Sequence, residues 1–420
     1  MMIIWGIVKF IILISFLVII HEGGHFLMAK AVGMKVNQFA VGFGPSIWEK
    51  QFGETLYAVR WIPLGGYVAL EGEEGDSEDP RAFNNKPVWA RFLVVVMGAT
   101  VNIVFALAAF FIIYYSAGQF PTTIVEGFTE GSAGASAGIQ VNDEIYKIDG
   151  KRMRTLSAVT EYLRVNKGKP INVTVKRDNQ MVDFVVTPNV EEMGLIGLTF
   201  VDNTAVIDEV SVDSPAKSAD FRSGDKILAV NGTAFSSVEE FTAFINGSAN
   251  VPVNITLLRE GEEISKEVTP ICPELLKKYV IGFYGKTSDD KVGLIGYSFW
   301  ESITQMQMML NQVYEIFTGQ INVKYLSGPV GIAKVVGATD TGSAFMTLLI
   351  FISLNLGIVN LLPIPPLDGG KLVFILIEGI TRKRPNPKIE MYLQMAGMAL
   401  LLLLMVFVTF NDITRNMSIF

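Results

Sequence analysis

Two histidines four residues apart, with a glutamate between them, are the residues of this sequence best suited to do chemistry. They are His21, Glu22 and His25, in the pattern H-E-x-x-H, and the chain has no other histidine. On a helix, positions i and i+4 share one face, so two such imidazoles can hold one zinc ion while Glu22 serves as general base. The alternative is a histidine pair that only packs in a core, but it leaves Glu22 unexplained in an apolar stretch, where ionisable residues are costly.

A carboxylate in the last third of the chain is the candidate for a third ligand. A catalytic zinc site uses three protein ligands and keeps a fourth position open. With no third histidine, an acidic residue must complete the set, and Asp368 is the best placed. It follows Pro363, Pro365 and Pro366, which must break the preceding helix. The alternative is an ordinary turn aspartate before Gly369.

Long apolar runs must position these residues. Half of the 420 residues are hydrophobic and only 18% are charged, which indicates a membrane protein with soluble parts. We expect transmembrane helices at 1–30, 91–116, 343–368 and 391–411, each long enough to cross a bilayer. The first carries H-E-x-x-H and the third ends at Asp368. The first is interpreted as a retained helix because no small-residue cleavage site follows it.

The basic residues of the short loops predict the orientation. Lysines and arginines gather in 31–90 and in the basic loop 369–390, so both should be cytoplasmic. The long middle region and the tail, 412–420, then lie outside, and the histidine motif lies near the cytoplasmic side. A net charge of −7 argues against a nucleic-acid partner, and one cysteine excludes an internal disulfide.

The first cytoplasmic region, 31–90, is expected to contain short strands broken by glycines. Residues 55–62 alternate in polarity, and Gly65-Gly66 could let an extended chain approach another backbone closely. A hairpin here could enter the membrane only where protein or water satisfies its polar groups. An ordinary cytoplasmic hairpin is the alternative.

The middle region contains an internal repeat. Residues 137–150 align with 219–232 at an offset of 82, which predicts two domains, 117–200 and 201–298. Each has short strands and one amphipathic helix, at 157–165 and 237–245. Each copy also reaches a Gly-Leu-Ile-Gly, at 194–197 and at 293–296. An amphipathic helix and a connector, 299–342, follow the second copy.

Both domains resemble PDZ domains. The resemblance is carried by the Ser-Pro-Ala of 214–216 in the second copy and the looser Ser132-Ala133 in the first, by the Gly-Asp-x-Ile element at 224–227, and by the turns Asp149-Gly150 and Asn231-Gly232. PDZ domains take an extended peptide, often a C-terminus, as an added strand. The alternative is a spacer or a steric filter.

The whole chain resembles the site-2 protease family of intramembrane metalloproteases, and within it the bacterial branch of regulator-of-sigma-E proteases. The resemblance is carried by H-E-x-x-H on the first span, by N-x-x-P-x-P-x-x-D-G ending the third, and by the two PDZ-like domains between the second and third spans. Where the family often has Ala-Gly-Pro, this chain has Gly98-Ala99-Thr100, and it keeps Asn102. The resemblance implies Zn²⁺ held by His21, His25 and Asp368, Glu22 as the catalytic glutamate, substrate handling by Asn360, Pro363 and Pro365, and a membrane re-entrant hairpin at Gly65 and Gly66.

The expected fold is therefore a multi-span α-helical membrane protein with four transmembrane helices, a membrane-associated β-hairpin loop and two tandem extracytoplasmic PDZ-like α+β domains. The expected function is that of an intramembrane zinc endopeptidase of the bacterial inner membrane, with periplasmic PDZ-like domains. It would cut transmembrane segments of pre-trimmed proteins, such as anti-sigma factors and signal-peptide remnants. The alternative is an inert membrane-anchored PDZ adaptor, whose structural zinc would need a fourth protein ligand.

Overall fold

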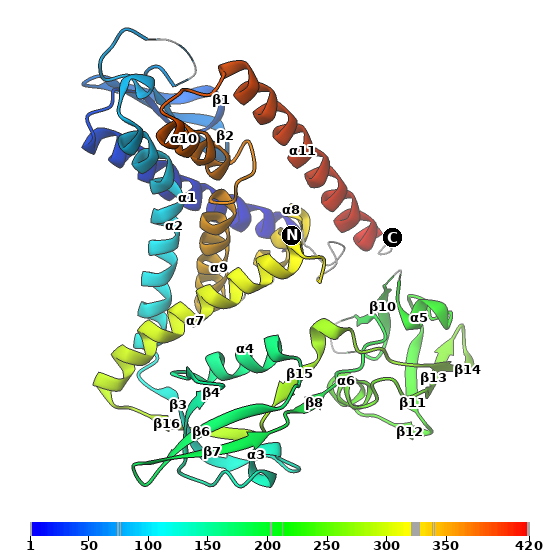
Figure 1. The fold of residues 1–420 in the computed structure, drawn as a ribbon. Helices are drawn as coiled ribbons and strands as arrows, with labels where there is room; N and C mark the ends of the chain where they lie inside the picture. Colours follow the sequence, from blue (N-terminus) through cyan, green and yellow to red (C-terminus); the bar gives the residue numbers. More distant parts are fainter. Residues whose placement is uncertain are drawn as a thin grey trace. The chain divides into compact units, whose positions relative to one another are not determined.

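A computed structural model describes residues 2–417 except 74, 76, 202, 203, 212, 321–327, 338 and 340. The chain forms two compact units (Figure 1). The membrane unit comprises residues 1–116 and 305–410, and the repeat unit comprises 117–304 with 411–420. Residues 321–327, in the expected connector, and 418–420, in the expected tail, lie outside the description.

Among the described residues, four helices of the membrane unit are long and apolar enough to cross a bilayer, as the sequence predicts. Their bounds are α1 Met2–Ala31, α2 Val88–Ser116, α9 Gly342–Asn360 and α11 Pro387–Met417. Helix α2 packs closely against both α1 and α9 at glycines. A Cβ on Gly24 would lie 2.7 Å from the Met97 carbonyl oxygen, and one on Gly357 would lie 2.9 Å from that of Ala99. Small residues at helix crossings allow this backbone approach.

The expected amphipathic helix begins earlier than predicted, as α7 Lys291–Phe317. In the membrane unit its Met306, Met309 and Val313 pack in one cluster with residues of α2 and α9, and Met309 is buried. The apolar stripe therefore packs on the helices of the membrane unit. A short helix, α8 Pro329–Gly337, precedes α9.

Residues 369–390 are not simply a loop, which corrects the expectation from their basic charge. Helix α10 spans Asp368–Thr381 and buries Leu372 and Ile375, which are three residues apart on one face. Two glycines at the start and exposed basic residues after the end obscured this helical pattern in the sequence. Helix α11 likewise continues to Met417, into the expected tail.

A buried ion pair fastens α10 to α2. The guanidinium of Arg91 donates two hydrogen bonds to the Glu378 carboxylate, at 2.9 and 2.6 Å. Both side chains are largely buried, with 6% and 13% exposed. The paired Arg91 holds the pKa of Glu378 below its usual value. Because α10 begins with Asp368, this pair also fixes the helix that carries that carboxylate.

We expect Glu378→Gln to destabilise the folded protein by about 3 kcal/mol, because it leaves the buried Arg91 charge uncompensated. The stabilising effect of the carboxylate is present above its unfolded-state pKa and is lost as the pH falls through its lowered folded-state pKa. Denaturation of the two proteins in detergent should therefore differ at neutral pH and converge in acid. Glu54→Gln, which removes a more exposed pair with Lys30, should have a much smaller effect. Equal losses from both variants would contradict this prediction.

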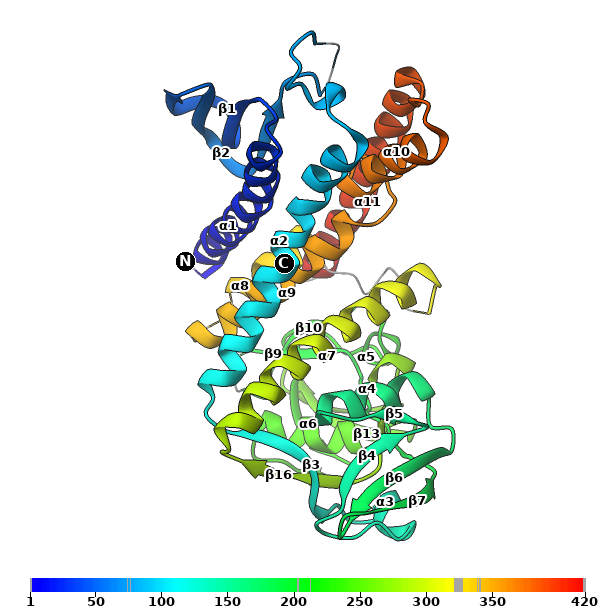
Figure 2. The ribbon, with the colours of Figure 1, turned by 60° about the vertical axis from the view of Figure 1, so that its left-hand side comes forward.

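The region after α1 forms a bent two-strand ribbon, β1 Val36–Phe52 and β2 Thr55–Leu70. The first part of β1, residues 36–43, pairs on one side with 66–70 and on the other with 56–59 and Ile62. The second part, 46–52, pairs with 55–60. The ribbon therefore folds back on itself as four short antiparallel segments, and it lies beside α1 in Figure 2.

The repeat unit contains two cores, each with an antiparallel sheet and a helix. The first sheet has the order β16-β3-β4-β6-β7 and the second β12-β11-β13-β14. The strands are β3 Phe120–Phe128, β4 Glu144–Ile148, β5 Lys151–Arg152, β6 Ile171–Arg177, β7 Gln180–Val186, β8 Asn189–Glu191, β9 Leu198–Phe200, β10 Ile207–Val210, β11 Lys226–Val230, β12 Thr233–Ala234, β13 Val253–Arg259, β14 Glu262–Val268, β15 Lys278–Val280 and β16 Phe283–Ser288. The helices are α3 Ala133–Ser136, α4 Leu156–Asn166, α5 Pro215–Ser218 and α6 Val238–Gly247, with a 3-10 turn at Glu274–Leu276; a second 3-10 turn, Phe83–Asn85, belongs to the membrane unit.

Equivalent positions in the two copies of the sequence repeat form equivalent ion pairs. Arg177 pairs with the buried Asp143 at 2.7 Å, and 82 residues later Arg259 pairs with the buried Asp225 at 2.8 Å. Each of these charge-assisted pairs joins the end of a strand to the turn before another. The offset read from the sequence therefore relates structurally equivalent residues.

The two cores exchange segments along the chain, which the sequence did not predict. Gly134 donates its backbone N–H to Ile281 at 2.9 Å, and the equivalent Ala216 donates to Ile196 at 3.0 Å. Ile281 lies in the first core and Ile196 in the second. Residues 278–288, expected within the second domain, thus belong to the first core, and β16 completes the first sheet. The second Gly-Leu-Ile-Gly, 293–296, lies in α7 and is not the equivalent of 194–197.

Candidate metal centre

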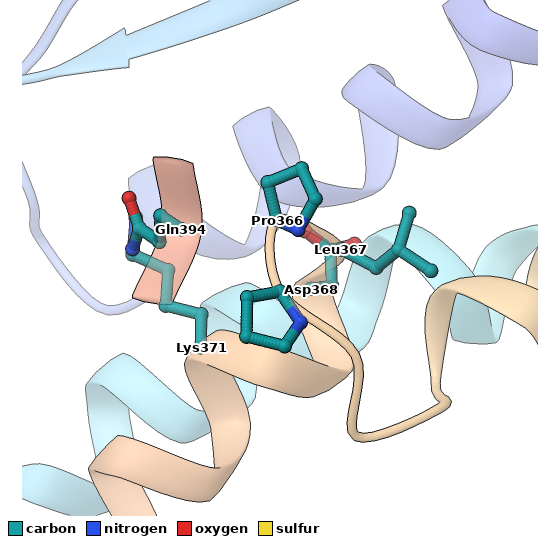
Figure 3. Close-up of a pocket in the computed structure, with 6 residues that line it drawn as sticks. Pro366, Leu367, Asp368, Lys371 and Gln394 are labelled. Carbon is teal, nitrogen blue, oxygen red and sulfur yellow. The ribbon is translucent and has the colours of Figure 1, made fainter. Parts of the chain in front are cut away.

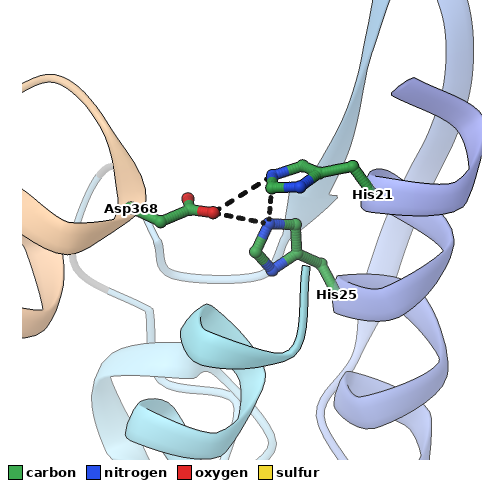
Figure 4. Close-up of side chains that lie close together, drawn as sticks. All are labelled: His21, His25 and Asp368. Atoms are coloured by element: carbon green, nitrogen blue, oxygen red, sulfur yellow. Dashed lines mark hydrogen bonds and ion pairs between the residues drawn. The ribbon is translucent and has the colours of Figure 1, made fainter. Parts of the chain in front are cut away.

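Helix α1 presents both histidines on one face (Figure 4). Their rings meet edge to face, with centroids 4.8 Å apart, and their Nε2 atoms are 3.2 Å apart. This is the arrangement expected from a four-residue spacing on a helix. His21 is buried and His25 is nearly so. The ring nitrogens are therefore held inside the membrane unit and face the same point.

A turn of seven residues brings Asp368 to that point. Helix α9 ends at Asn360, so the third span is shorter than the expected 343–368, and α10 starts at Asp368. The turn is tight, because a Cβ on Gly370 would lie 2.8 Å from the Pro365 nitrogen, and one on Gly369 would overlap the Leu362 carbonyl. Glycine is required at both positions for this close approach. The carboxylate of Asp368 projects from the start of α10 toward the histidines (Figure 4).

The three side chains form a nearly regular triangle of donor atoms. Asp368 Oδ2 lies 3.1 Å from Nε2 of His21 and 3.2 Å from Nε2 of His25. Bond lengths of 2.0–2.2 Å in a tetrahedral zinc site place neighbouring ligand atoms about 3.3 Å apart. The triangle therefore has the size that three ligands of one zinc ion require, and it leaves a fourth position.

The hydrogen bonds around the triangle also fit a cation. Nδ1 of His25 lies 2.8 Å from the Val94 carbonyl oxygen, which can only accept, so this nitrogen carries the proton. In the neutral ring, Nε2 is then an acceptor and faces a second acceptor, Asp368 Oδ2, which is buried without a hydrogen-bond donor. Two acceptors at this distance repel each other unless a positive charge lies between them. The donor set, two imidazoles and a carboxylate, suits zinc.

Glu22 lies beside the ribbon. A Cβ on Gly66 would lie 2.8 Å from the Ala40 carbonyl oxygen and 3.5 Å from Cγ of Glu22. Gly66 therefore lets β2 approach both β1 and this face of α1 closely. Its neighbour Gly65 has a φ of +91° and faces the ring of Phe43, so a larger residue would be strained there. The sequence predicts a close backbone approach at both glycines. In the structure, Gly66 lies next to Glu22.

The residues of the proline turn lie in different places. Nδ2 of Asn360 is 3.4 Å from Nε2 of His21, so this side chain borders the triangle. Pro363 is exposed. Pro365 lines a cavity of about 140 Å³ together with Pro366, Leu367, Asp368, Lys371 and Gln394 (Figure 3). Lys371 forms an ion pair with Glu73.

Three residues of α2 complete the centre, and the sequence analysis did not predict them as site residues. They are Val94, whose carbonyl holds His25; Gly98, whose missing side chain leaves room for the His25 ring; and Asn102, next to His21. A Cβ on Gly98 would overlap that ring. The one available signal was Asn102 itself, a polar amide in an otherwise apolar span.

Comparison with known proteins gives matches over nearly the whole chain. Residues 9–404 match the description "Peptidase family M50". A regulator of sigma E protease from Haemophilus influenzae is 31% identical, with 98% of this chain and 99% of the relative covered. A zinc metalloprotease RasP from Oceanobacillus iheyensis is also 31% identical, covering 97% of this chain and 99% of the relative.

Proposed function

Because the chain belongs to peptidase family M50 and is an intramembrane zinc metalloprotease of the site-2 protease type, we propose that His21, His25 and Asp368 hold its zinc ion and that Glu22 is its catalytic glutamate. The observation that carries this proposal is the convergence of those three side chains, from segments more than 340 residues apart, on one point. The inert adaptor considered from the sequence is disfavoured because a structural zinc site would need a fourth protein ligand, and among the described residues these three side chains alone converge here.

The roles of the side chains follow from their chemistry. When bound, zinc supplies a Lewis acid that lowers the pKa of water to about 7 and polarises a carbonyl group. Glu22, adjacent to His21 on α1, takes a proton from the attacking water and passes it to the leaving amine. The Val94 carbonyl keeps His25 in the tautomer that can act as a ligand. Burial among α1, α2 and α10 limits the access of bulk water.

The substrate we propose is a transmembrane segment of a single-span protein already shortened on its outer side. A helical substrate hides its peptide bonds in hydrogen bonds and must unwind before attack. Among the described residues, 66–70 of β2 pair on one side only, with β1, and Gly66 borders Glu22. An unwound segment can add to that free edge as a strand. Asn360 and the turn with Pro363 and Pro365 would contact it beside the metal.

The relative named as a regulator of sigma E protease favours membrane-anchored anti-sigma factors as one substrate class, with remnant signal peptides as another. We place the protein in the inner membrane, with the metal centre toward the cytoplasm, because the short loops at 31–90 and 382–388 are rich in lysine and arginine. The two cores of the repeat unit would then be periplasmic PDZ-like domains. They would bind the exposed C-termini of trimmed substrates or exclude larger ones.

A panel of single-span substrates tests this proposal, each offered with and without its outer domain to the purified protein in detergent. We expect cleavage within the transmembrane segment of the trimmed forms, loss of cleavage with a zinc chelator, and recovery when zinc is restored. Mass spectrometry of the products gives the cleaved bond. Equal cleavage of long and trimmed forms would contradict the trimming requirement, and cleavage that persists in metal-free protein would contradict the zinc mechanism.

A further inference from the structure

The two histidines of the centre are supported differently. Nδ1 of His25 is bonded to a backbone carbonyl, which no side-chain substitution removes. Nδ1 of His21 instead faces the side chain of Asn102, whose amide nitrogen is 3.4 Å away. Asn102 is fully buried, and its amide oxygen has no hydrogen-bond partner. A buried amide with an unpartnered oxygen next to a candidate metal ligand calls for an explanation.

The orientation of that amide decides what His21 can do. Nε2 of His21 points at Asp368 and at His25, so it must carry a lone pair if it is to bind a cation. Its Nδ1 then carries the ring proton and needs an acceptor. The oxygen and nitrogen of an amide have nearly the same shape, and rotating the group by 180° exchanges them. In the rotated orientation the amide oxygen of Asn102 faces Nδ1–H of His21 and accepts a hydrogen bond from it.

The position of Asn102 is fixed by a third helix. The hydroxyl of Ser353, on α9, donates a hydrogen bond of 3.0 Å to the backbone carbonyl of Asn102. Ser353 is also fully buried. Close packing of Gly357 against Ala99 and Ile103 holds the same stretch of α2. The packing of α9 against α2 therefore fixes the position of Asn102. A residue that orients a metal ligand must be held in place in this way.

We propose that Asn102 is the positioning residue of His21: its amide oxygen accepts a hydrogen bond from Nδ1–H of His21 and so keeps the lone pair of Nε2 free for the metal. This inference rests on the proposed function of the centre. Asn102 would then hold the ring of His21 in the same way that the backbone carbonyl of Val94 holds the ring of His25. Outer-shell partners of this kind typically change metal affinity by about 10–100-fold when they are removed.

Zinc affinity of the purified full-length protein, measured by competition with a chromogenic chelator, tests the proposal. We expect Asn102→Leu, which has no acceptor, to weaken zinc binding by about 10–100-fold. Asn102→Asp keeps an acceptor in the same place and should bind zinc within a few-fold of the wild type. The matched control is Thr100→Val, two residues away on α2, whose hydroxyl donates a hydrogen bond to the Val96 carbonyl of its own helix. Its affinity should be unchanged.

A second measurement, of the two histidine rings themselves, requires neither enzymatic activity nor bound metal. Because the chain has only two histidines, nuclear magnetic resonance of protein labelled with ¹⁵N only at histidine reports two rings. We expect Asn102→Leu to change the nitrogen shifts of His21 and leave those of His25, in both metal-free and zinc-loaded protein. A leucine variant with wild-type affinity and spectrum, or an aspartate variant as defective as the leucine one, would overturn the proposal. Failure of the wild type to bind zinc would instead refute the proposed function, and the metal-free spectra would still decide the role of Asn102.

Discussion

Glu22→Gln is expected to reduce cleavage of a transmembrane substrate by about 10⁴-fold, the upper range for loss of a general base, while the protein keeps its zinc. Glutamine has nearly the same shape as glutamate, so the packing of α1 against Gly66 should survive the change. It cannot take up the proton of the attacking water, and so it cannot deliver one to the leaving amine. The three proposed ligands are untouched, because His21, His25 and Asp368 use none of the atoms of Glu22.

The measurement is the single-turnover rate on one trimmed substrate, with zinc content determined on the same preparation. Glu54→Gln is the matched control, since it makes the same chemical change at an exposed position after β1 that contacts Lys30 and Arg81. Its cleavage rate should stay close to that of the wild type. If Glu22→Gln cleaved normally while fully loaded with zinc, another group would have to be the base, and the role assigned to Glu22 would fail.

Local patterns in the sequence predicted the parts of the molecule that depend on local chemistry. Four apolar runs became the four candidate spans, because a membrane selects for hydrophobic length. The spacing of His21 and His25 fixed their common face, because a helix repeats every 3.6 residues. The need for a third ligand, in a chain without a third histidine, indicated Asp368, and the structure brings it to 3.1 Å from His21.

Features that depend on how distant segments pack could not be predicted in the same way. Nothing local marks Gly98 as the place where the His25 ring must fit, since only the register between α1 and α2 creates that contact. The exchange of segments between the two cores likewise depends on contacts between residues far apart in the sequence. Residues 194–197 and 278–288 each follow one copy of the repeat but belong to the other. Helix α10 was missed because its burial depends on contact with α2, and a short basic segment resembles a loop.

Asp368→Asn is expected to lower zinc affinity by more than about 100-fold, and cleavage with it. Removal of an outer-shell partner alone typically costs about 10–100-fold, and this change affects a proposed ligand itself. Asparagine has the same shape, so the start of α10 and the proline turn should be preserved. It replaces one carboxylate oxygen with an amide nitrogen and removes the negative charge that offsets the charge of the ion.

The comparison that decides this case is with Lys371→Gln. Lys371 lines the same cavity as Asp368, one helical turn further along α10, and also carries a charge. If Asp368 only caps a turn, as Asp-Gly sequences often do, then Asp368→Asn should bind zinc as well as Lys371→Gln does. If Asp368 is a ligand, the asparagine variant alone should lose zinc to a chelator that leaves the wild type loaded. Because α1 and α10 reach the centre from opposite ends of the sequence, that loss would show that zinc also joins the two helices, and metal-free wild type should share the lower thermal stability of the variant.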